Sequence, residues 1–244
     1  MANGAPIKVL VCGNGRMGAL VRASVEADEA FDFVGQVGIE DVSALDAGEV
    51  PAAELVIDFT NRAMLPHLAA YLESNPAALV SGTTGLDADD FALLDRLAER
   101  MPVMWSANYS LGVAVLRRLA AEAAKALEGF DIEIVETHHN QKVDAPSGTA
   151  KLLLSAVDPE GACDVVSGRD GFVGARPQRE IGMHALRGGT VAGTHEVHFF
   201  GTDEEVCLTH RATSRQIFVN GAVAAAKRLA GQEPGRYTFE ELML

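Results

Sequence analysis

The sequence predicts an α/β protein of two domains, in which a doubly wound parallel sheet is joined to an α+β domain with a mixed open sheet. Three observations support this fold class. A short apolar run leads directly into a G-x-G-x-x-G loop and then into a helix-permissive segment. Strand-like and helix-like segments alternate over residues 1–109, as in parallel sheets. After about residue 180, strand-like runs are separated only by short turns, which is typical of hairpins.

The first strand and the loop after it predict a Rossmann-like dinucleotide site. Ile7–Cys12 is a continuous apolar run of the kind found in buried parallel strands. Glycines at the three motif positions allow a tight turn, close approach of a pyrophosphate, and packing of the next helix against the strand. We therefore expect a cofactor to contact the six residues of this loop, which are Gly13, Asn14, Gly15, Arg16, Met17 and Gly18.

The rest of the first domain supplies further candidate cofactor contacts. The strand Phe31–Val37 is followed by Glu40 and Asp41, about twenty residues after the last glycine, where a ribose-binding carboxylate belongs; a solvated acidic loop is the alternative. Further strands are expected at 55–60, 78–81 and 103–106, and helices at about 62–74 and 87–100, the second capped by Asp87. Ligands of such sheets lie at the carboxyl ends of the strands. That edge includes Thr60, 82–85 and 107–110.

Composition narrows the possible partners. The net charge of -14 argues against nucleic acid or an anionic membrane surface, so an anionic substrate would need local cations. The three cysteines, Cys12, Cys163 and Cys207, lie far apart without metal-type spacing, and no trio of histidines has zinc-site spacing, so we expect no metal. There is no apolar run of about 18 residues and no signal-like start, and we expect a cytoplasmic protein with reduced thiols.

The second domain is expected between residues 110 and 215, and the first is expected to comprise 1–109 and 216–244. A helix from about 113 to 127 leads to a strand at 132–135, and a mobile loop is expected over 158–180. Strand-like runs at 181–187, 194–200 and 205–212 then predict successive hairpins. The helix at 216–230 belongs to the first domain.

The densest polar stretch, Glu136–Ala150, follows the strand at 132–135. Paired histidines lie where that strand ends, and a helix is expected to begin after Ser147 as N-cap. The unpaired backbone N–H groups of its first turn, together with the helix dipole, form a binding site for an anion. Such a stretch suits a small carboxylate substrate that needs a proton; a capped helix after a solvated loop is the alternative. The candidate residues are His138, His139, Lys142, Gly148 and Thr149.

Six motifs together resemble those of the 4-hydroxy-tetrahydrodipicolinate reductase family, also called dihydrodipicolinate reductases, over essentially the whole chain. They are Gly13–Gly18, Ile57–Thr60, Gly82–Gly85, Ala107–Ser110, His138–Thr149 and Arg215–Ala222. The resemblance implies NAD(P)H-dependent reduction of 4-hydroxy-tetrahydrodipicolinate, through dihydrodipicolinate, to tetrahydrodipicolinate in lysine and diaminopimelate biosynthesis. Members are typically homotetramers joined through the second domain.

By this resemblance, the proton donor is His138, and Lys142 either donates the proton or binds carboxylate. The dicarboxylate substrate would be held by His139, Gly148 and Thr149. Further cofactor contacts would come from Phe59, Thr60, Gly82, Thr83, Thr84, Ala107, Asn108 and Tyr109.

The region after the second strand departs from the family pattern. Many members carry a basic residue there for the 2'-phosphate of NADPH, and many have one residue more in the glycine loop. Here Glu40 and Asp41 occupy the region, and no Lys or Arg lies between Arg22 and Arg62. NADH or NADPH is therefore expected, with NADH slightly favoured, although Arg16 could reach a phosphate.

Two other functions are compatible with parts of the sequence. Another NAD(P)-dependent dehydrogenase of an amino or hydroxy acid would share the glycine loop but would not need the segment Lys142–Thr149. A nucleotide-sensing regulatory protein without turnover would keep the glycine loop but would not need two titratable imidazoles beside an anion site.

Overall fold

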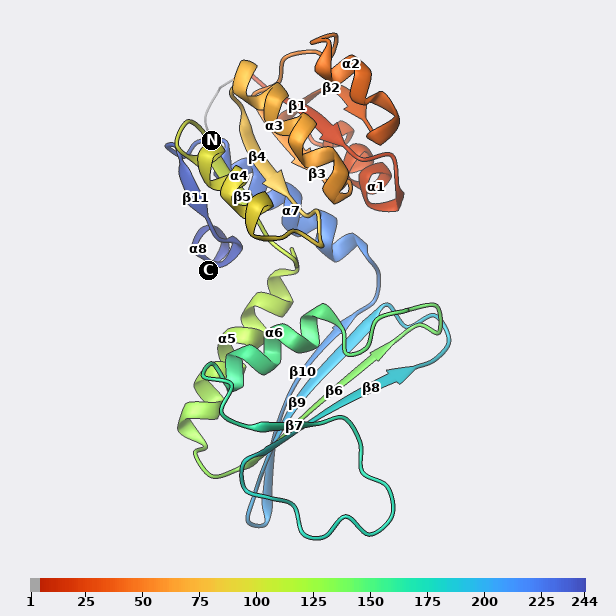
Figure 1. Cartoon of the computed structure of the whole chain (residues 1–244), viewed down its shortest axis with the longest axis vertical. Helices are drawn as coiled ribbons and strands as arrows, with labels where there is room; N and C mark the ends of the chain where they lie inside the picture. The colour runs from red at the N-terminus through yellow and green to blue at the C-terminus, as the bar shows by residue number, and fades with distance from the viewer. Residues whose placement is uncertain (1–4) are drawn as a thin grey trace. The chain divides into compact units, whose positions relative to one another are not determined.

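The computed structural model describes residues 5–244 and divides the chain into two compact units (Figure 1). The first unit comprises the residues up to Ser110 together with Gln216–Leu244, and the second comprises Leu111–Arg215. Each unit has its own sheet and its own hydrophobic core. Within residues 5–244, no helix is long and apolar enough to cross a bilayer.

The sheet of the first unit has six parallel strands in the order β11-β5-β4-β3-β1-β2. The chain moves outward from β1 in both directions, so the strand order reverses there and the carboxyl edge beside β1 is where ligands of such sheets bind. The central strands are fully buried, which explains their continuous apolar runs. The strands are β1 Ile7–Cys12, β2 Phe31–Val37, β3 Leu55–Asp58, β4 Ala78–Ser81, β5 Pro102–Trp105 and β11 Gly235–Tyr237.

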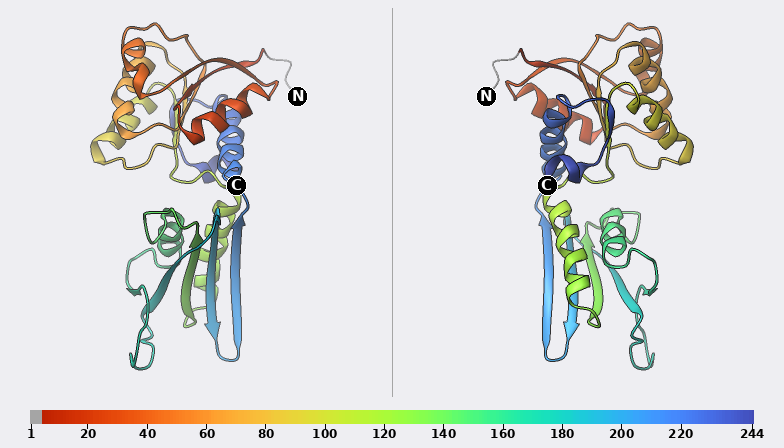
Figure 2. Two further views of the ribbon diagram at one scale, coloured as in Figure 1. Left: turned by 90° about the vertical axis from the view of Figure 1, so that its right-hand side faces the viewer. Right: turned by 90° about the vertical axis from the view of Figure 1, so that its left-hand side faces the viewer.

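Helices cover both faces of this sheet, as a doubly wound fold requires (Figure 2). One layer contains α1 Arg16–Glu26, α7 Gln216–Leu229 and α8 Phe239–Met243. The other contains α2 Val42–Asp46, α3 Leu65–Ser74 and α4 Ala88–Ala98, with short 3-10 turns at Ile39–Asp41 and Arg62–Met64. Asp87 caps α4 as expected, because its side chain accepts hydrogen bonds from the N–H groups of Asp89 and Asp90.

The second unit contains a mixed five-stranded sheet in the order β10-β9-β6-β8-β7. Helices α5 Leu111–Ala126 and α6 Gly148–Val157 contact each other and pack on one face of the sheet, around a core that includes Ile134 and Phe199. The strands are β6 Asp131–His138, β7 Asp164–Val166, β8 Glu180–Arg187, β9 Gly193–Gly201 and β10 Glu204–Ala212. The predicted fold class, a doubly wound parallel sheet plus a mixed sheet, is confirmed.

Two expectations for the second unit were wrong. Only β9 and β10 form a hairpin, because β6 lies between β8 and β9, parallel to the first and antiparallel to the second. Apolar alternation identifies a strand but not its neighbours, so the sequence could not show this insertion. The segment 158–180 is not one continuous loop either, because Asp164–Val166 forms β7 at the edge of the sheet.

Candidate functional site

The glycine loop connects β1 to α1, as predicted, and its three glycines have different surroundings. A Cβ on Gly13, whose φ is +122°, would lie 2.6 Å from the carbonyl oxygen of Phe59, and a Cβ on Gly18 would lie 1.8 Å from that of Gly13. A Cβ on Gly15 would meet nothing within 4 Å. The first and third glycines are therefore required by packing within the protein, whereas the second faces open space that a ligand can enter.

The acidic residues after β2 lie beside this loop. The Gly13 N–H donates to the carbonyl of Val37 at 2.7 Å, which holds the loop against the end of β2. The Asn14 side-chain amide donates to Glu40, and Asp41 accepts from the Gly38 N–H at 2.8 Å. The structure thus places Glu40 and Asp41 beside the glycine loop. Arg16 is exposed in the first turn of α1.

The buried carboxylate of Asp58, at the end of β3, joins two of the predicted cofactor loops. It accepts hydrogen bonds from the N–H of Thr60 at 3.0 Å and from its hydroxyl at 2.5 Å. The hydroxyls of Ser81 and Thr83 donate to its other oxygen at 2.7 and 2.9 Å. Asp58 belongs to the motif Ile57–Thr60, where the sequence alone indicated no role for it. In the structure it fixes the ends of β3 and β4 relative to each other.

Tyr109 is buried beneath the carboxyl ends of β3 and β4. Its hydroxyl donates to the carbonyl of Ser81 at 2.7 Å, and its ring makes edge-to-face contacts with Phe59 and Phe239 at 5.7 and 5.4 Å. The side chains of Tyr109 and Thr83 are only 2% and 1% exposed. These two predicted cofactor residues are therefore buried supports that shape the loops from inside.

In the second unit, the predicted polar stretch joins the end of β6 to the start of α6. Ser147 is the N-cap of α6, because its hydroxyl accepts from the N–H of Ala150 at 3.2 Å. Gly148 and Thr149 lie in the first turn, as expected. A Cβ on Gly148 would meet nothing within 4 Å, so the helix N-terminus is open to an approaching anion.

A fully buried carboxylate, that of Glu136, organises this stretch. Both its oxygens accept from the guanidinium of Arg187 at 2.8 Å, and it accepts from Nδ1 of His138 at 2.5 Å and from the N–H of Ser147 at 3.0 Å. Burial by itself would raise the pKa of Glu136, but the hydrogen bonds from Arg187 and His138 hold it below its usual value. Glu136 therefore stays ionised and ties β6, β8 and the N-cap of α6 together.

Two other predicted residues of this stretch, Lys142 and His139, also have charged partners. Nζ of Lys142 donates to Asp144 at 2.7 Å, and this hydrogen bond lowers the pKa of the Asp144 carboxyl. Nη2 of Arg215 donates to Nε2 of His139 at 3.3 Å. Arg187 and Lys142 are paired with the carboxylates of Glu136 and Asp144, so the guanidinium of Arg215 is the cation of this group that contacts a histidine and not a carboxylate. A cation beside the open N-terminus of α6 is suited to an anionic substrate.

A third histidine, His195 on β9, belongs to the same cluster although the sequence suggested only a strand residue. Its Nε2 lies 3.1 Å from the Ser147 hydroxyl, and its ring meets that of His138 edge to face at 5.1 Å. Burial, followed by the nearby charge of His138, lowers the pKa of His195 to about 4. His195 is therefore neutral at pH 7, which leaves His138 as the imidazole of this pair with a carboxylate partner.

Within the described residues, one group of side chains has metal-type donors. It lies on the face of the second unit's sheet that α5 and α6 do not cover. It comprises His198, Glu205 and Cys207. Glu205 accepts from Nδ1 of His198 at 2.6 Å, and Nε2 of the same histidine lies 3.9 Å from Sγ of Cys207. With the carboxylate engaged by the imidazole, two donors remain, whereas structural zinc sites use four protein ligands. We therefore assign no metal to this group.

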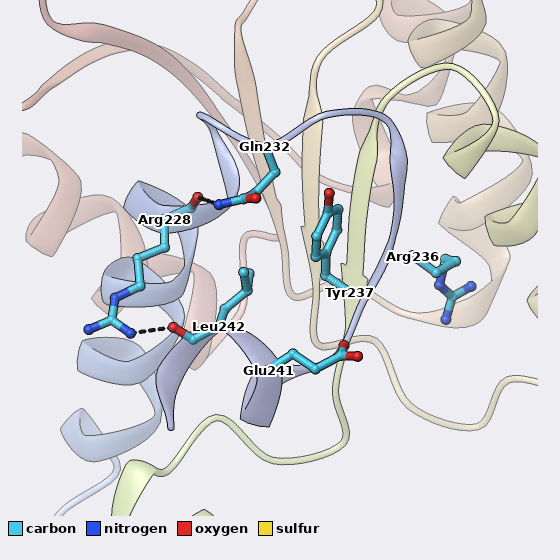
Figure 3. A pocket seen from close by; sticks show the side chains of 6 residues that line it. All are labelled: Arg228, Gln232, Arg236, Tyr237, Glu241 and Leu242. Atoms are coloured by element: carbon cyan, nitrogen blue, oxygen red, sulfur yellow. Dashed lines mark hydrogen bonds between the residues drawn. The ribbon is translucent and has the colours of Figure 1, made fainter.

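A cavity of about 550 Å³ lies in the first unit among the C-terminal elements (Figure 3). Its polar side chains are engaged with neighbouring atoms: Arg228 donates to the carbonyl of Leu242, Gln232 donates to that of Arg228, and Arg236 pairs with Asp95. None of the predicted site residues lines it. We therefore do not assign ligand binding to this cavity.

Comparison with known proteins identifies the family. Residues 7–109 match the family model described as dihydrodipicolinate reductase, N-terminus, and residues 112–243 match the corresponding C-terminus model. The chain is 41% identical to the 4-hydroxy-tetrahydrodipicolinate reductase of Caldanaerobacter subterraneus subsp. tengcongensis over 97% of this chain and 98% of that protein. It is 42% identical to the one from Campylobacter lari, over 94% and 96%.

Among solved structures, the chain resembles the dipicolinate-bound dihydrodipicolinate reductase of Paenisporosarcina sp. TG-14. The TM-score is 0.77 at 20% identity, with 97% of this chain and 99% of that chain covered. At this identity the likeness concerns the fold, which agrees with the two sheets described above. The two matched models together span nearly all of the chain, and the resemblance inferred from the six sequence motifs is confirmed. The chain belongs to the dihydrodipicolinate reductase family.

Proposed function

We propose that the chain catalyses the NAD(P)H-dependent reduction of 4-hydroxy-tetrahydrodipicolinate, through dihydrodipicolinate, to tetrahydrodipicolinate in lysine and diaminopimelate biosynthesis. The observation that carries the proposal is the arrangement in the second unit. An imidazole held by a buried carboxylate ends β6, and the open N-terminus of α6 lies at the other end of the same short segment. This arrangement can bind a small carboxylate and supply a proton.

The residues of the first unit would bind the cofactor, with the open side of Gly15 facing the pyrophosphate and Glu40 or Asp41 accepting from the adenosine ribose. Reduced nicotinamide would supply the hydride to a carbon conjugated with the ring C=N of the substrate. We infer that NADH is used at least as well as NADPH, because an acidic pair accepts hydrogen bonds from ribose hydroxyls but repels a 2'-phosphate.

The reduced intermediate is an enamine, which needs a proton on carbon. Nδ1 of His138 is engaged by Glu136, so Nε2 is the atom that would deliver this proton. Lys142 is the alternative donor, since an ammonium beside a carboxylate can both bind charge and lend a proton. The substrate carboxylates would be divided between Gly148 with Thr149 and the side chains of His139 with Lys142.

We further propose that the protein is a homotetramer joined through the second unit, whose sheet has one face covered by α5 and α6. No helix of this unit, among the described residues, covers the opposite face. That face exposes Leu186 and Phe200 at 49% and 40%. Burying such apolar side chains between copies of the chain would favour association. Light scattering of the purified protein would measure the mass.

Cofactor-dependent turnover tests the proposed activity. The purified protein should consume reduced nicotinamide only when 4-hydroxy-tetrahydrodipicolinate is supplied, and the ratio of kcat/KM for NADH and NADPH should be one or greater. An amino-acid or hydroxy-acid dehydrogenase would respond to its own substrate instead, and a regulatory protein would bind the cofactor without turnover. A strong preference for NADPH would show that Arg16 or the backbone outweighs the acidic pair.

Replacement of the two candidate donors assigns the proton. His138→Gln should lower kcat by about 10²- to 10⁴-fold with a smaller effect on KM, and Lys142→Met should damage both constants. A His138→Gln enzyme with near-normal kcat, beside a Lys142→Met enzyme that binds substrate normally but does not turn over, would move the proton donation to Lys142.

A further inference from the structure

We propose that Glu136, clamped by Arg187, is a positioning residue for proton transfer: it fixes the His138 imidazole with its hydrogen on Nδ1 and leaves Nε2 to exchange the proton with substrate. The inference rests on the proposed function, because it concerns the group that we name there as proton donor. Glu136 itself is fully buried, and its role is to act through His138.

The strand geometry explains why Glu136 meets Nδ1. The two residues are two positions apart on β6, so their side chains leave the same face of the sheet. Oε2 of Glu136 lies 2.5 Å from Nδ1 of His138. An ionised carboxylate can only accept hydrogen bonds, so Nδ1 must carry the hydrogen. In the neutral ring Nε2 then holds the lone pair, and in the imidazolium it holds the proton that can be transferred.

Arg187 makes this arrangement possible. A carboxylate that is fully buried loses its hydration, and it remains ionised only if a cation and hydrogen bonds replace the water. The guanidinium of Arg187 supplies both, because its two terminal nitrogens bond the two oxygens of Glu136 at 2.8 Å. Arg187 is also the register partner of His138 across β6 and β8, so the sheet itself holds the pair in place.

The same ion pair also holds the later part of the loop between β6 and α6. Nη2 of Arg187 donates to the carbonyl of Asp144 at 2.8 Å, and Oε1 of Glu136 accepts from the N–H of Ser147 at 3.0 Å. A displacement of Glu136 would therefore move both His138 and the N-terminus of α6. The donor and the anion site share one support, which keeps their separation fixed.

The chain contains a matched control on the same strand. Glu133 lies on the opposite face of β6, where Arg169 donates to it at 2.7 Å and Nε2 of His184 lies 2.7 Å from its other oxygen. Burial by itself would raise its pKa, but the hydrogen bonds from Arg169 and His184 lower it to about 2. This cluster also joins a carboxylate, arginine and histidine, but it has no helix N-terminus beside it.

Kinetics of Glu136→Gln and Glu133→Gln test the inference. Glu136→Gln should lower kcat by about 10²- to 10⁴-fold and shift the pH profile of kcat, since the amide no longer fixes the tautomer. Glu133→Gln should leave both within about twofold of the original enzyme, because it affects an ion-pair cluster on the face of β6 opposite to His138. Since that face is also the one proposed for association, light scattering should give this variant the same mass as the original protein. Arg187→Lys, which keeps the charge but loses the paired geometry, should fall between the two.

Nitrogen NMR of the histidine rings gives a readout that is independent of turnover. In the unaltered protein, the ring signals that disappear in His138→Gln should show hydrogen on Nδ1, and in Glu136→Gln both tautomers should be populated. Hydrogen on Nε2 alone in the unaltered protein would overturn the inference, as would a folded Glu136→Gln enzyme with normal kcat. If the unaltered protein does not reduce the substrate, the proposed function fails, and the NMR result still decides how His138 is held.

Discussion

Replacing Gly18 by alanine tests whether the glycine loop is set by packing within the protein. The new Cβ would lie 1.8 Å from the carbonyl oxygen of Gly13, and real Cβ contacts essentially never fall below 3.0 Å, so the two segments must separate by at least 1.2 Å (3.0 − 1.8). Gly13 and Gly18 are both buried at the junction of β1 and α1, and the carbonyl of Gly13 is backbone, which cannot rotate away as a flexible side chain can. Overpacking of a core costs about 1–3 kcal/mol and occasionally more, and we expect a loss of ~3 kcal/mol.

Urea unfolding measures this loss, because the single tryptophan, Trp105, lies in β5 of the same unit and reports its unfolding. Gly15→Ala is the matched control, since its Cβ meets nothing within 4 Å and its φ of -80° suits alanine. That variant should have a free energy of unfolding within ~1 kcal/mol of that of the original protein, because alanine restricts the unfolded chain but is a poorer N-cap of α1 than glycine. It should nevertheless bind NADH at least about tenfold more weakly, because the methyl group enters the open space. A Gly18→Ala protein with an unchanged unfolding midpoint would refute the reasoning.

Three further predictions follow from individual side chains. Asp58→Asn should lower the free energy of unfolding by ~1.5–3 kcal/mol, because an amide replaces one acceptor oxygen among buried donors; chemical denaturation measures this, and an unchanged value would contradict it. His195 should titrate near pH 4 by NMR, and stability should fall as pH drops from 6.5 towards 4, because the unfolded chain then binds the proton first; a midpoint near 6.5 would contradict its burial. Thr149→Val should raise KM more than it lowers kcat in steady-state assays, since it removes a hydroxyl at the proposed carboxylate site; the reverse pattern would place Thr149 in the chemical step.

Local patterns predicted most of the first unit. The strands β3 and β4 are short apolar runs with polar residues after them, and the cap at Asp87 has a local cause, so each could be recognised without knowledge of distant residues. The three-residue strands β7 and β11 were missed. Each exists only because its backbone pairs with a neighbouring strand, β8 or β5, and three residues contain no usable periodicity.

In the candidate site, too, features with a local cause could be predicted and contacts between distant residues could not. The histidine stretch and the glycine loop could be identified because their residues are close in sequence. Arg187 was not proposed, although it bonds Glu136 with both terminal nitrogens, since the two residues are 51 positions apart and meet only through the pairing of β6 with β8. The order of the strands in the second sheet was itself predicted wrongly. No contact that depends on this order could have been inferred.

Among the described residues, each unit has a buried carboxylate at or near the end of a strand, Asp58 in β3 and Glu136 in β6. Hydrogen-bond acceptors are needed there. Beyond the last ladder hydrogen bond, the loops carry N–H and hydroxyl donors that no neighbouring strand satisfies. Asp58 accepts from the donors of two loops, and Glu136 accepts from the N–H of Ser147 and from Nδ1 of His138. An ionised carboxylate has about four acceptor positions and no hydrogen to donate, so it can hold several donors in one arrangement. The loops are therefore fixed by the protein before any ligand arrives, and binding need not include the cost of ordering them.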